Sequence, residues 1–358
     1  MRRLLVCLGI LVAAMASAQD AGRTGWAVVE LSANFMREKP DFDEELGDQA
    51  LMGTVVEILD IQGSWIKIRT LEPYTAWVTD LGLVQMDEAA LRDYLEAPKY
   101  ICTAAYSHIY EEPSLKSGIV SEFILGDIVR IMYKTIHHTS GRYKGYDEGR
   151  AVLTKKFVGV VLPSGKTGYV PAKDVAVFYK WAKDKEELLS KPDEVRENIV
   201  NTTRMFLGVP YMWGGTSIKN VDCSGLTRTV FLANGILLPR NASQQARCGE
   251  EVGFLDAAGN VSWSGLLPGD LVFWGREATE SAPEKVSHVG IYIGGGEFIH
   301  SSHYVRVGSL DPASGKYYDR RPLHVRRIVG PAGGSGTENG LGKGAEAIFQ
   351  NPSYFTGY

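Results

Sequence analysis

The sequence predicts an α+β chain in which two small all-β domains precede a compact domain that mixes helices and strands. Residues 26–178 contain short apolar runs separated by turn signals, which is typical of small all-β domains. The pattern becomes charged and helical over residues 183–207. A chain of 358 residues is also long for one domain, which favours two or three compact units.

The first residues have the pattern of a secretory signal peptide. Arg2 and Arg3 are positively charged, residues 4–15 are apolar, and residues 16–18 form a small-residue cleavage site. A transmembrane anchor would need roughly 20 apolar residues, and this run is shorter. We therefore expect residues 1–18 to be removed, the mature protein to be periplasmic or secreted, and no segment to span a membrane.

The composition is that of a soluble globular protein. The chain is 44% hydrophobic and 22% charged, with 38 basic and 42 acidic residues. Nucleic-acid binding would require a basic patch, so we expect no nucleic acid among the partners of this mildly acidic chain. The oligomeric state stays open.

Turn signals mark two all-β domains, which we place at residues 26–88 and 100–178. In the first, residues 54–59 and 64–69 flank Gln62-Gly63, which predicts a β-hairpin. In the second, three apolar runs predict strands at residues 119–123, 128–132 and 157–162.

The two domains share a spacing that indicates a divergent internal repeat. Trp65 is followed 12 positions later by Trp77, and Phe157 is followed 12 positions later by Tyr169. A strand, a loop containing Gly or Pro, and a returning aromatic strand resemble the bacterial SH3-like (SH3b) domains. Two unrelated β-meanders would also explain the pattern.

A helical period begins after the second domain. We place a linker at residues 180–190 and a compact catalytic domain at residues 190–330. Glycine-rich sequence follows, so residues 331–358 are expected to form a flexible C-terminal tail.

Three cysteines would remain after export, and an odd number leaves at least one thiol unpaired. Cys102 lies in an apolar stretch and is expected in a core. Cys223 follows Asp222, a good N-cap residue, and precedes an apolar stripe that ends at Asn234-Gly235. Cys223 is therefore predicted to begin a helix, where backbone N–H groups lower the pKa of a thiol and can bind an oxyanion.

Two histidines are predicted to meet on one face of a hairpin. Residues 287–293 alternate as a strand, three glycines follow, and residues 297–301 return. Pairing of Ile293 with Glu297 puts Gly290 opposite His300, so that His288 and His300 become diagonal neighbours. A thiol, a histidine base and a polar group that orients the histidine form an activated nucleophile.

Five separated motifs resemble the NlpC/P60 cysteine peptidases in order and spacing. They cover about residues 190–330 and lie at residues 210–215 (PYMWGG), 222–225 (DCSG), 267–271 (LPGDL), 287–292 (SHVGIY) and 298–300 (FIH). Together with two SH3b-like domains, they resemble the γ-D-glutamyl-L-diamino acid endopeptidase branch. This branch hydrolyses the bond between γ-D-glutamate and the diamino acid (diaminopimelate or lysine) of peptidoglycan stem peptides.

The resemblance implies a papain-like catalytic core that needs no cofactor. It implies Cys223 as nucleophile, His288 as base and His300 as the group that orients His288, with the Tyr211 hydroxyl at the oxyanion. The residues that it places at the substrate are Trp213, Asp222 and Ser224, to which we add Ser243 in the polar loop after Pro239-Arg240.

The resemblance also gives the first SH3b-like domain a role. In this branch that domain closes the far end of the cleft, so that only peptides with a free N-terminal L-Ala fit. The matching residues here are Tyr74 and an acid that falls on Glu45 or Asp48, or is missing if the alignment selects Gly47.

Plainer explanations stay open for several of these residues. Capping alone explains Asp222, a position beside a Gly-Gly turn explains Tyr211 and Trp213, and solvent exposure explains Ser243. Tyr74 could be an aromatic at a barrel rim. Asp270 is expected in a turn, and the pair at residues 137–138 (HH) at the surface. A zinc site is disfavoured, because no Cys-x-x-Cys or His-x-x-x-His spacing accompanies Cys223.

Other functions would use the same motifs. The domain could cut the intact sacculus, act as an amidase or acyltransferase on the same scaffold, or be an inactive wall-binding protein. The preferred diamino acid, and the choice between sacculus and released murein fragments, are not predicted.

Overall fold

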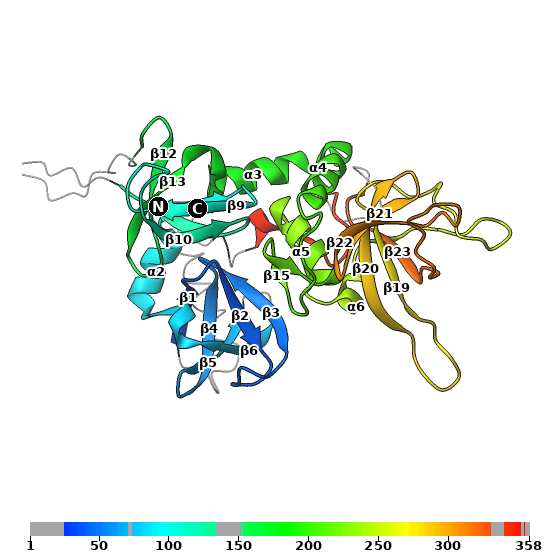
Figure 1. Cartoon of the computed structure of the whole chain (residues 1–358), viewed down its shortest axis with the longest axis horizontal. Helices are drawn as coiled ribbons and strands as arrows, with labels where there is room; N and C mark the ends of the chain where they lie inside the picture. The colour runs from blue at the N-terminus through cyan, green and yellow to red at the C-terminus, as the bar shows by residue number, and fades with distance from the viewer. Residues whose placement is uncertain are drawn as a thin grey trace, which may run out of the picture. The chain divides into compact units, whose positions relative to one another are not determined.

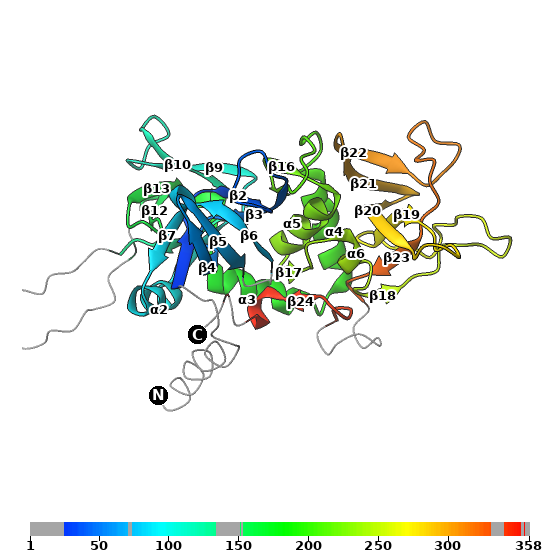
Figure 2. The same cartoon turned by 90° about the horizontal axis from the view of Figure 1, so that it is seen from below.

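The structure is a computed structural model that describes residues 25–70, 74–133, 151, 153–330, 340–351 and 354. Residues 1–18, the predicted signal peptide, and the histidines at 137–138 lie outside the described residues. The chain divides into two compact units. The first contains the described residues up to 35 together with 50–181, and the second contains 36–49 together with the described residues from 182 to 354. Figures 1 and 2 label the elements of both units.

The first sheet has seven strands in the order β3-β2-β6-β5-β4-β1-β7. Strands β4 and β5 are joined at Gln62-Gly63, where Gln62 pairs with Trp65, so the predicted hairpin is confirmed. A short 3-10 helix, η1 (Asp80–Gly82), precedes the last strand. The strands are β1 (Gly25–Val29), β2 (Ala33–Arg37), β3 (Leu46–Leu51), β4 (Val55–Gln62), β5 (Trp65–Thr70), β6 (Thr75–Thr79) and β7 (Leu83–Met86).

The second sheet repeats this topology. Its order, β10-β9-β13-β12-β11-β8-β14, is the first order with every strand number raised by seven, and η2 (Ala172–Asp174) again precedes the last strand. The predicted repeat is therefore confirmed. Cys102 is buried in the core of this sheet, as predicted. The strands are β8 (Lys99–Cys102), β9 (Tyr106–Tyr110), β10 (Ile119–Ile124), β11 (Ile128–Ile131), β12 (Phe157–Val161), β13 (Thr167–Pro171) and β14 (Val175–Val177).

A helix that the sequence analysis missed, α2 (Glu88–Glu96), lies between these sheets in the chain. Asp87 caps it by accepting a hydrogen bond from the Ala90 amide. Leu91 and Tyr94 pack against Trp26 of the first sheet. Only these two helical residues are buried, which is too short an apolar stripe to stand out in the sequence.

The expected helical region at 183–207 consists of two helices. Helix α3 (Phe178–Leu188) occupies most of the predicted linker at 180–190, and the boundary between the two units, after Trp181, lies inside that segment. Helix α4 (Pro192–Arg204) begins with a proline in its first turn. The N–H groups of the first turn have no acceptor within the helix, so a proline there costs no helical hydrogen bond. The break between the helices follows from that proline, because the residue before a proline disfavours helical dihedrals.

The second unit is built on a six-stranded antiparallel sheet, β18-β23-β19-β20-β21-β22. Helix α5 (Cys223–Ala233) packs against β20 and β21, and the short α6 (Ala242–Gln245) also contacts β20 (Figure 2). The predicted α+β architecture is thereby confirmed. The strands are β18 (Glu250–Glu251), β19 (Leu271–Arg276), β20 (Lys285–Gly294), β21 (Glu297–Ser302), β22 (Tyr304–Ser309) and β23 (His324–Arg327).

Two short ladders complete the unit. Strand β15 (Thr216–Ser217) pairs with β16 (Asn220–Val221), and β17 (Ile236–Leu237) pairs with β24 (Glu346–Ala347), which leads into η3 (Ile348–Gln350). Leu341 and Ile348 are buried. The described part of the expected flexible tail is therefore packed: it buries these two side chains and forms a backbone ladder with β17. No helix among the described residues is long and apolar enough to cross a membrane.

Candidate active site

Helix α5 places Cys223 at its first residue, as predicted. The Asp222 side chain accepts a hydrogen bond from the Gly225 amide at 2.7 Å, so Asp222 caps the helix. The helix ends at Ala233, and Gly235 follows with a φ of +79°, which favours glycine. Gly225 is required for packing, because a Cβ atom there would lie 1.9 Å from the carbonyl oxygen of Gly215.

The β20–β21 hairpin has the predicted register at the residues that bring the two histidines together. Gly290 is opposite His300 and Tyr292 is opposite Phe298. The turn differs from the expectation, since Glu297 pairs with Gly294 and a register shift follows Tyr292. Residues 294–296 all have positive φ angles, so the three glycines form the turn themselves.

His288 and His300 contact each other directly. Their Nε2 and Nδ1 atoms are 2.7 Å apart, and the rings are inclined at 77°. Burial, followed by the positive charges of Arg320 and Arg306, lowers the pKa of His288 to about 4. Burial and the neighbouring His288 lower the pKa of His300 to about 3. Both rings are therefore neutral at pH 7. In the tautomer in which Nε2 of His288 donates to Nδ1 of His300, Nδ1 of His288 is free to accept a proton.

The thiol of Cys223 lies beside the strand that carries His288. The amides of Val289, the next residue along, and of Ser224 form hydrogen bonds with the sulfur that stabilise a thiolate. Burial, reinforced by the carboxylate of Asp222, nevertheless raises the thiol pKa to about 11. The expected depression of this pKa is therefore not found, because the sequence signal of a helix start carries no information on burial.

Tyr211 is held near the thiol by the backbone. Tyr211 forms a parallel β-bridge with Val221, and its backbone amide donates a hydrogen bond to the carbonyl of His303 at 2.9 Å. Burial and the nearby Cys223 and Asp222 raise the pKa of Tyr211 to about 12, so its hydroxyl is a hydrogen-bond donor at neutral pH. Trp213, two residues on, is 61% exposed.

A buried arginine ties this helix start to the segment 36–49. Arg240 donates to Oδ2 of Asp222 at 2.5 Å and to Oγ of Ser224 at 3.1 Å. Its Nε atom forms an ion pair with Oδ1 of Asp48 at 3.1 Å. Ser224 in turn donates to Asp222. The oxygens of Asp222 and the hydroxyl of Ser224 are thus already hydrogen-bonded within the protein, and their predicted contact with substrate stays a prediction.

Asp48 has further partners inside the same unit. Arg228 donates to both of its oxygens, at 3.1 and 3.0 Å, and the hydroxyl of Thr216 donates at 2.8 Å. A carboxylate with this many partners is poorly suited to meet a substrate ammonium group. Of the two acids considered from the sequence, Glu45 is the exposed one. The local pattern around Asp48 gave no sign of the buried ion pairs, because their partners lie about 170 to 190 residues away in the chain.

The sequence analysis also missed an aromatic wall around the two histidines. The ring of Tyr318, in the loop between β22 and β23, lies 5.1 Å from His300 and 5.8 Å from His288. Trp274 on β19 lies 5.6 Å from His288. These rings remove water from the imidazoles, which is the desolvation that lowers their pKa values. No motif marked Tyr318, since it lies in an irregular loop.

The other predicted residues are outside this cluster or have structural partners. Ser243 is exposed on α6. Asp270 is buried and paired with Arg327 at 2.7 Å, in agreement with a structural role. Tyr74 precedes β6 in the first unit, where its amide donates to Thr70. Among the described residues, no group of histidine, cysteine and acidic side chains has the arrangement of a metal site.

Sequence comparisons define the class of the catalytic domain. A profile of the NlpC/P60 family matches residues 208–327, and a profile of the bacterial dipeptidyl-peptidase Sh3 domain matches residues 36–83. The chain therefore carries an NlpC/P60 domain behind a bacterial SH3 domain, and it is a cysteine peptidase by class.

Individual relatives extend the similarity to most of the chain. The chain is 28% identical over 295 residues to a γ-D-glutamyl-L-lysine dipeptidyl-peptidase of Bacillus cereus. The matched region covers 80% of this chain and 76% of that protein. It is 26% identical over 289 residues to dipeptidyl-peptidase 6 of Lysinibacillus sphaericus, covering 79% and 91%. The crystal structure of an NlpC/P60 family protein from Bacillus cereus, 22% identical, covers 85% of this chain and 99% of its own with a TM-score of 0.62, which shows a common fold.

Proposed function

We propose that this protein is an exported cysteine peptidase that hydrolyses the γ-D-glutamyl-L-diamino acid bond of peptidoglycan stem peptides. The observation that carries the proposal is the arrangement of His288 and His300, 2.7 Å apart, beside the thiol at the start of α5. The names of the two relatives, both dipeptidyl-peptidases, support release of a dipeptide. The signal pattern at residues 1–18 supports a periplasmic or secreted location.

In the proposed mechanism, His288 is the base. Nε2 of its ring faces His300, so Nδ1 takes the proton of Cys223 as the sulfur attacks the γ-carbonyl carbon of D-glutamate. Because the thiol pKa is near 11 and that of His288 near 4, the resting pair is a neutral thiol and a neutral imidazole. Proton transfer therefore accompanies attack, when the negative charge passes on to the substrate oxygen.

The same residues complete the reaction. The amide at the start of α5 and the hydroxyl of Tyr211 are the donors proposed for the oxyanion. The imidazolium of His288 then gives its proton to the departing amine of the diamino acid, which leaves a thioester on Cys223. Water, deprotonated by His288, hydrolyses that thioester and releases L-Ala-γ-D-Glu. His300 holds the ring of His288 throughout, and it is the positioning residue of the pair.

Digestion of a defined peptide tests this proposal. The mature protein should convert L-Ala-γ-D-Glu-diaminopimelate into the dipeptide L-Ala-γ-D-Glu and free diaminopimelate, as measured by mass spectrometry. The lysine peptide, run in parallel, reports which diamino acid is preferred. With a muropeptide as an additional substrate, release of the intact stem peptide from muramic acid would instead support an amidase. Formation of a new amide between the tripeptide and an added amine would support an acyltransferase. A wild-type protein that leaves every peptide intact would contradict the proposal.

A further inference from the structure

Two arginines lie beside the catalytic histidines, and the first of them is on the same sheet. Arg306 of β22 is directly opposite His300 of β21 in the antiparallel ladder. Residues paired in this way have their side chains on one face of the sheet. Trp274 is paired with His288 in the same manner on β19 and β20. Because the two histidines contact each other, a row of side chains crosses the sheet from Trp274 through His288 and His300 to Arg306.

The second arginine comes from the loop between β22 and β23. The guanidinium carbon of Arg320 lies 6.0 Å from the centroid of the Tyr318 ring. That ring lies 5.1 Å from His300 and 5.8 Å from His288. The backbone carbonyl of Arg320 accepts a hydrogen bond from the indole N–H of Trp274 at 3.1 Å, which fixes this part of the loop to β19. Two positive charges thus lie near the base, each on a different element.

Neither arginine is neutralised by a carboxylate of the described chain. No ion pair joins Arg306 or Arg320 to another described residue, and Asp319, the acid next to Arg320, is exposed. Arg240 of the same unit is different, because it is buried against two aspartates. The charges of Arg306 and Arg320 act on the reacting groups, since both help to lower the pKa of His288. An anion bound here would therefore meet two uncompensated cations.

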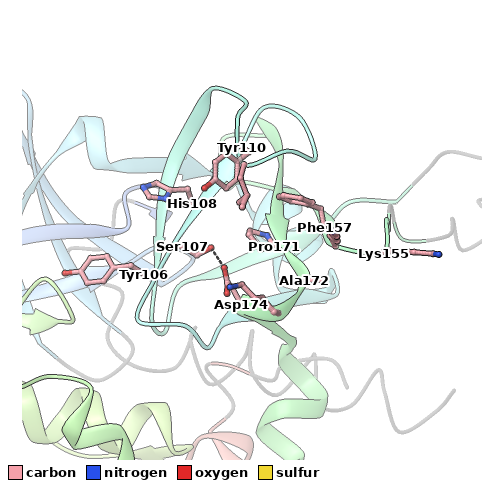
Figure 3. A pocket seen from close by; sticks show the side chains of 12 residues that line it. Tyr106, Ser107, His108, Tyr110, Lys155, Phe157, Pro171, Ala172 and Asp174 are labelled. Carbon is pink, nitrogen blue, oxygen red and sulfur yellow. Dashed lines mark hydrogen bonds between the residues drawn. The ribbon is translucent and has the colours of Figure 1, made fainter.

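The lysines of the second sheet are not part of this arrangement. Lys155, Lys156 and Lys173 line a cavity of about 410 Å³ (Figure 3), and every residue of its lining belongs to the first unit. The two histidines and the two arginines belong to the second unit. The arginines are therefore the charges whose positions relative to the base are defined by the fold of one unit.

The substrate brings its own anions to this side of the reaction. In the proposed mechanism His288 gives its proton to the departing amine, so the diamino acid lies beside His288 while the glutamyl half is bonded to Cys223. In a tripeptide, the carbon that carries this amine also carries a free carboxylate. Diaminopimelate has a second carboxylate at the far end of its side chain, next to the ammonium group. Lysine has the same chain and the same ammonium group without that carboxylate.

We propose that Arg306 and Arg320 bind the carboxylates of the departing diamino acid and thereby make this enzyme select diaminopimelate over lysine. A guanidinium group can bind a carboxylate through two parallel hydrogen bonds, whereas the ammonium group of lysine is repelled by both arginines. The Bacillus cereus relative is named for lysine, so this preference would distinguish the chain from it. The inference rests on the proposed function, because that reaction is what places a diamino acid beside His288.

Three tripeptides that share L-Ala-γ-D-Glu test the selection. They end in diaminopimelate, in diaminopimelate whose far carboxylate is converted to an amide, and in lysine. The amidated peptide is the matched control, because it keeps the size and the amine of the acidic peptide and loses one negative charge. The wild-type enzyme should cleave the acidic peptide with a kcat/KM about tenfold or more above that of each of the others. Equal values for the acidic and amidated peptides, or a preference for lysine, would overturn the proposal.

Variants assign the selection to the arginines. Arg320→Gln and Arg306→Gln should each reduce the ratio of kcat/KM between the acidic and amidated peptides to about threefold or less. Arg320 is exposed, so its replacement tests the proposal even if the half-buried Arg306 is needed for folding. Arg321→Gln, which removes the exposed arginine next along the chain, is the matched control and should keep the wild-type ratio. If the arginines act on the histidines alone, Arg320→Gln will change all three rates by the same factor, and that result would reject the carboxylate contact.

Binding to the Cys223→Ala variant separates this inference from the proposed reaction. The variant should hold the three peptides without cleaving them, and calorimetric titration should give the acidic peptide the highest affinity. Selective binding by a protein whose wild type cleaves none of the peptides would contradict the proposed reaction and retain the arginine site. Cleavage of all three peptides at one rate, with equal affinities, would retain the reaction and reject the role of the arginines.

Discussion

The Nε atom of Arg240 lies 3.1 Å from Oδ1 of Asp48, and both side chains are almost fully buried, at 6% and 1% exposure. Arg240 also binds Asp222, the residue that caps the helix of Cys223. One arginine thus joins the segment 36–49 to the start of the catalytic helix. Because each charge is buried, removing one leaves its partners uncompensated in a medium of low polarity.

Asp48→Asn should therefore destabilise the protein by about 3 kcal/mol or more. The amide keeps the shape of the side chain but leaves Arg228 and Arg240 with less negative charge. The free energy of unfolding in urea measures the loss. Arg247→Gln, which changes an exposed arginine close to α6, should stay within about 0.5 kcal/mol of wild type. A tolerated Asp48→Asn would show that the ion pairs are not needed for stability.

The catalytic assignment predicts a graded set of losses. Cys223→Ala and His288→Ala should each abolish tripeptide cleavage without unfolding the protein, since both side chains take part in bond making. His300→Ala should reduce kcat by roughly one to three orders of magnitude while KM changes little, because His300 acts by orienting His288. His300→Gln, which can still accept a hydrogen bond, should recover part of the loss. Full activity of His300→Ala would show that another group orients the base.

The features of this site that could be predicted are those that depend on short sequence patterns. The start of α5 and the register that brings His288 to His300 follow from short patterns, a cap residue in one case and strand alternation around a glycine turn in the other. The repeat was visible because both copies retain the spacing of a hairpin.

Features that depend on distant partners were missed. The ion pairs of Asp48 join residues up to 192 positions apart, and the ring of Tyr318 comes from an irregular loop. The thiol pKa was predicted in the wrong direction for the same reason, since burial results from tertiary packing. A helix with only two buried residues, α2, was too weakly amphipathic to recognise.

The rate of thiol alkylation should rise with pH in the alkaline range. Burial raises the pKa of Cys223 to about 11, so the thiolate fraction at pH 7 is small and grows as the pH increases toward that value. Iodoacetamide labelling of Cys223, followed by peptide mass analysis between pH 5 and 10, measures this. The buried Cys102 is an internal control for global unfolding, because it should not react at any of these pH values. A rate that is already maximal below pH 7 would show that a thiolate-imidazolium pair forms in the free enzyme.

Acid should destabilise the fold through the two histidines. Their pKa values are lowered to about 4 and 3 in the folded protein, whereas an unfolded histidine has a pKa near 6.5. The unfolded state therefore binds more protons as the pH falls from 6.5 toward 4, and stability present above pH 6.5 is lost in that window. Between pH 7 and 5 the loss should be about 2–4 kcal/mol. In the double variant His288→Gln, His300→Gln this pH dependence should largely disappear, and its persistence would place the responsible groups elsewhere.

The last prediction concerns the free amine of the substrate. The resemblance to the endopeptidase branch gives Tyr74 and an acid of the first SH3-like domain the role of closing the cleft around an N-terminal L-Ala. Asp48 is occupied by two arginines and Thr216, so of the acids considered we expect Glu45 to meet the ammonium group. The free peptide L-Ala-γ-D-Glu-diaminopimelate should be cleaved, whereas the same peptide in amide linkage to muramic acid should be cleaved at least a hundredfold more slowly.

The physical reason is twofold, because the blocked peptide would lose a charge-assisted contact and would add bulk where we propose that Tyr74 closes the cleft. Glu45→Gln should raise KM for the free peptide with little change in kcat, since it removes binding that is equal in the ground and transition states. Glu38→Gln, another acid of the same segment, is the matched control and should behave like wild type. Tyr74→Ala should narrow the difference in kcat/KM between the free and the blocked peptide, because it would open the end of the cleft that Tyr74 is proposed to close. Equal kcat/KM values for the two peptides on the wild-type enzyme would reject this role of the first domain and place the enzyme among those that cut the intact sacculus.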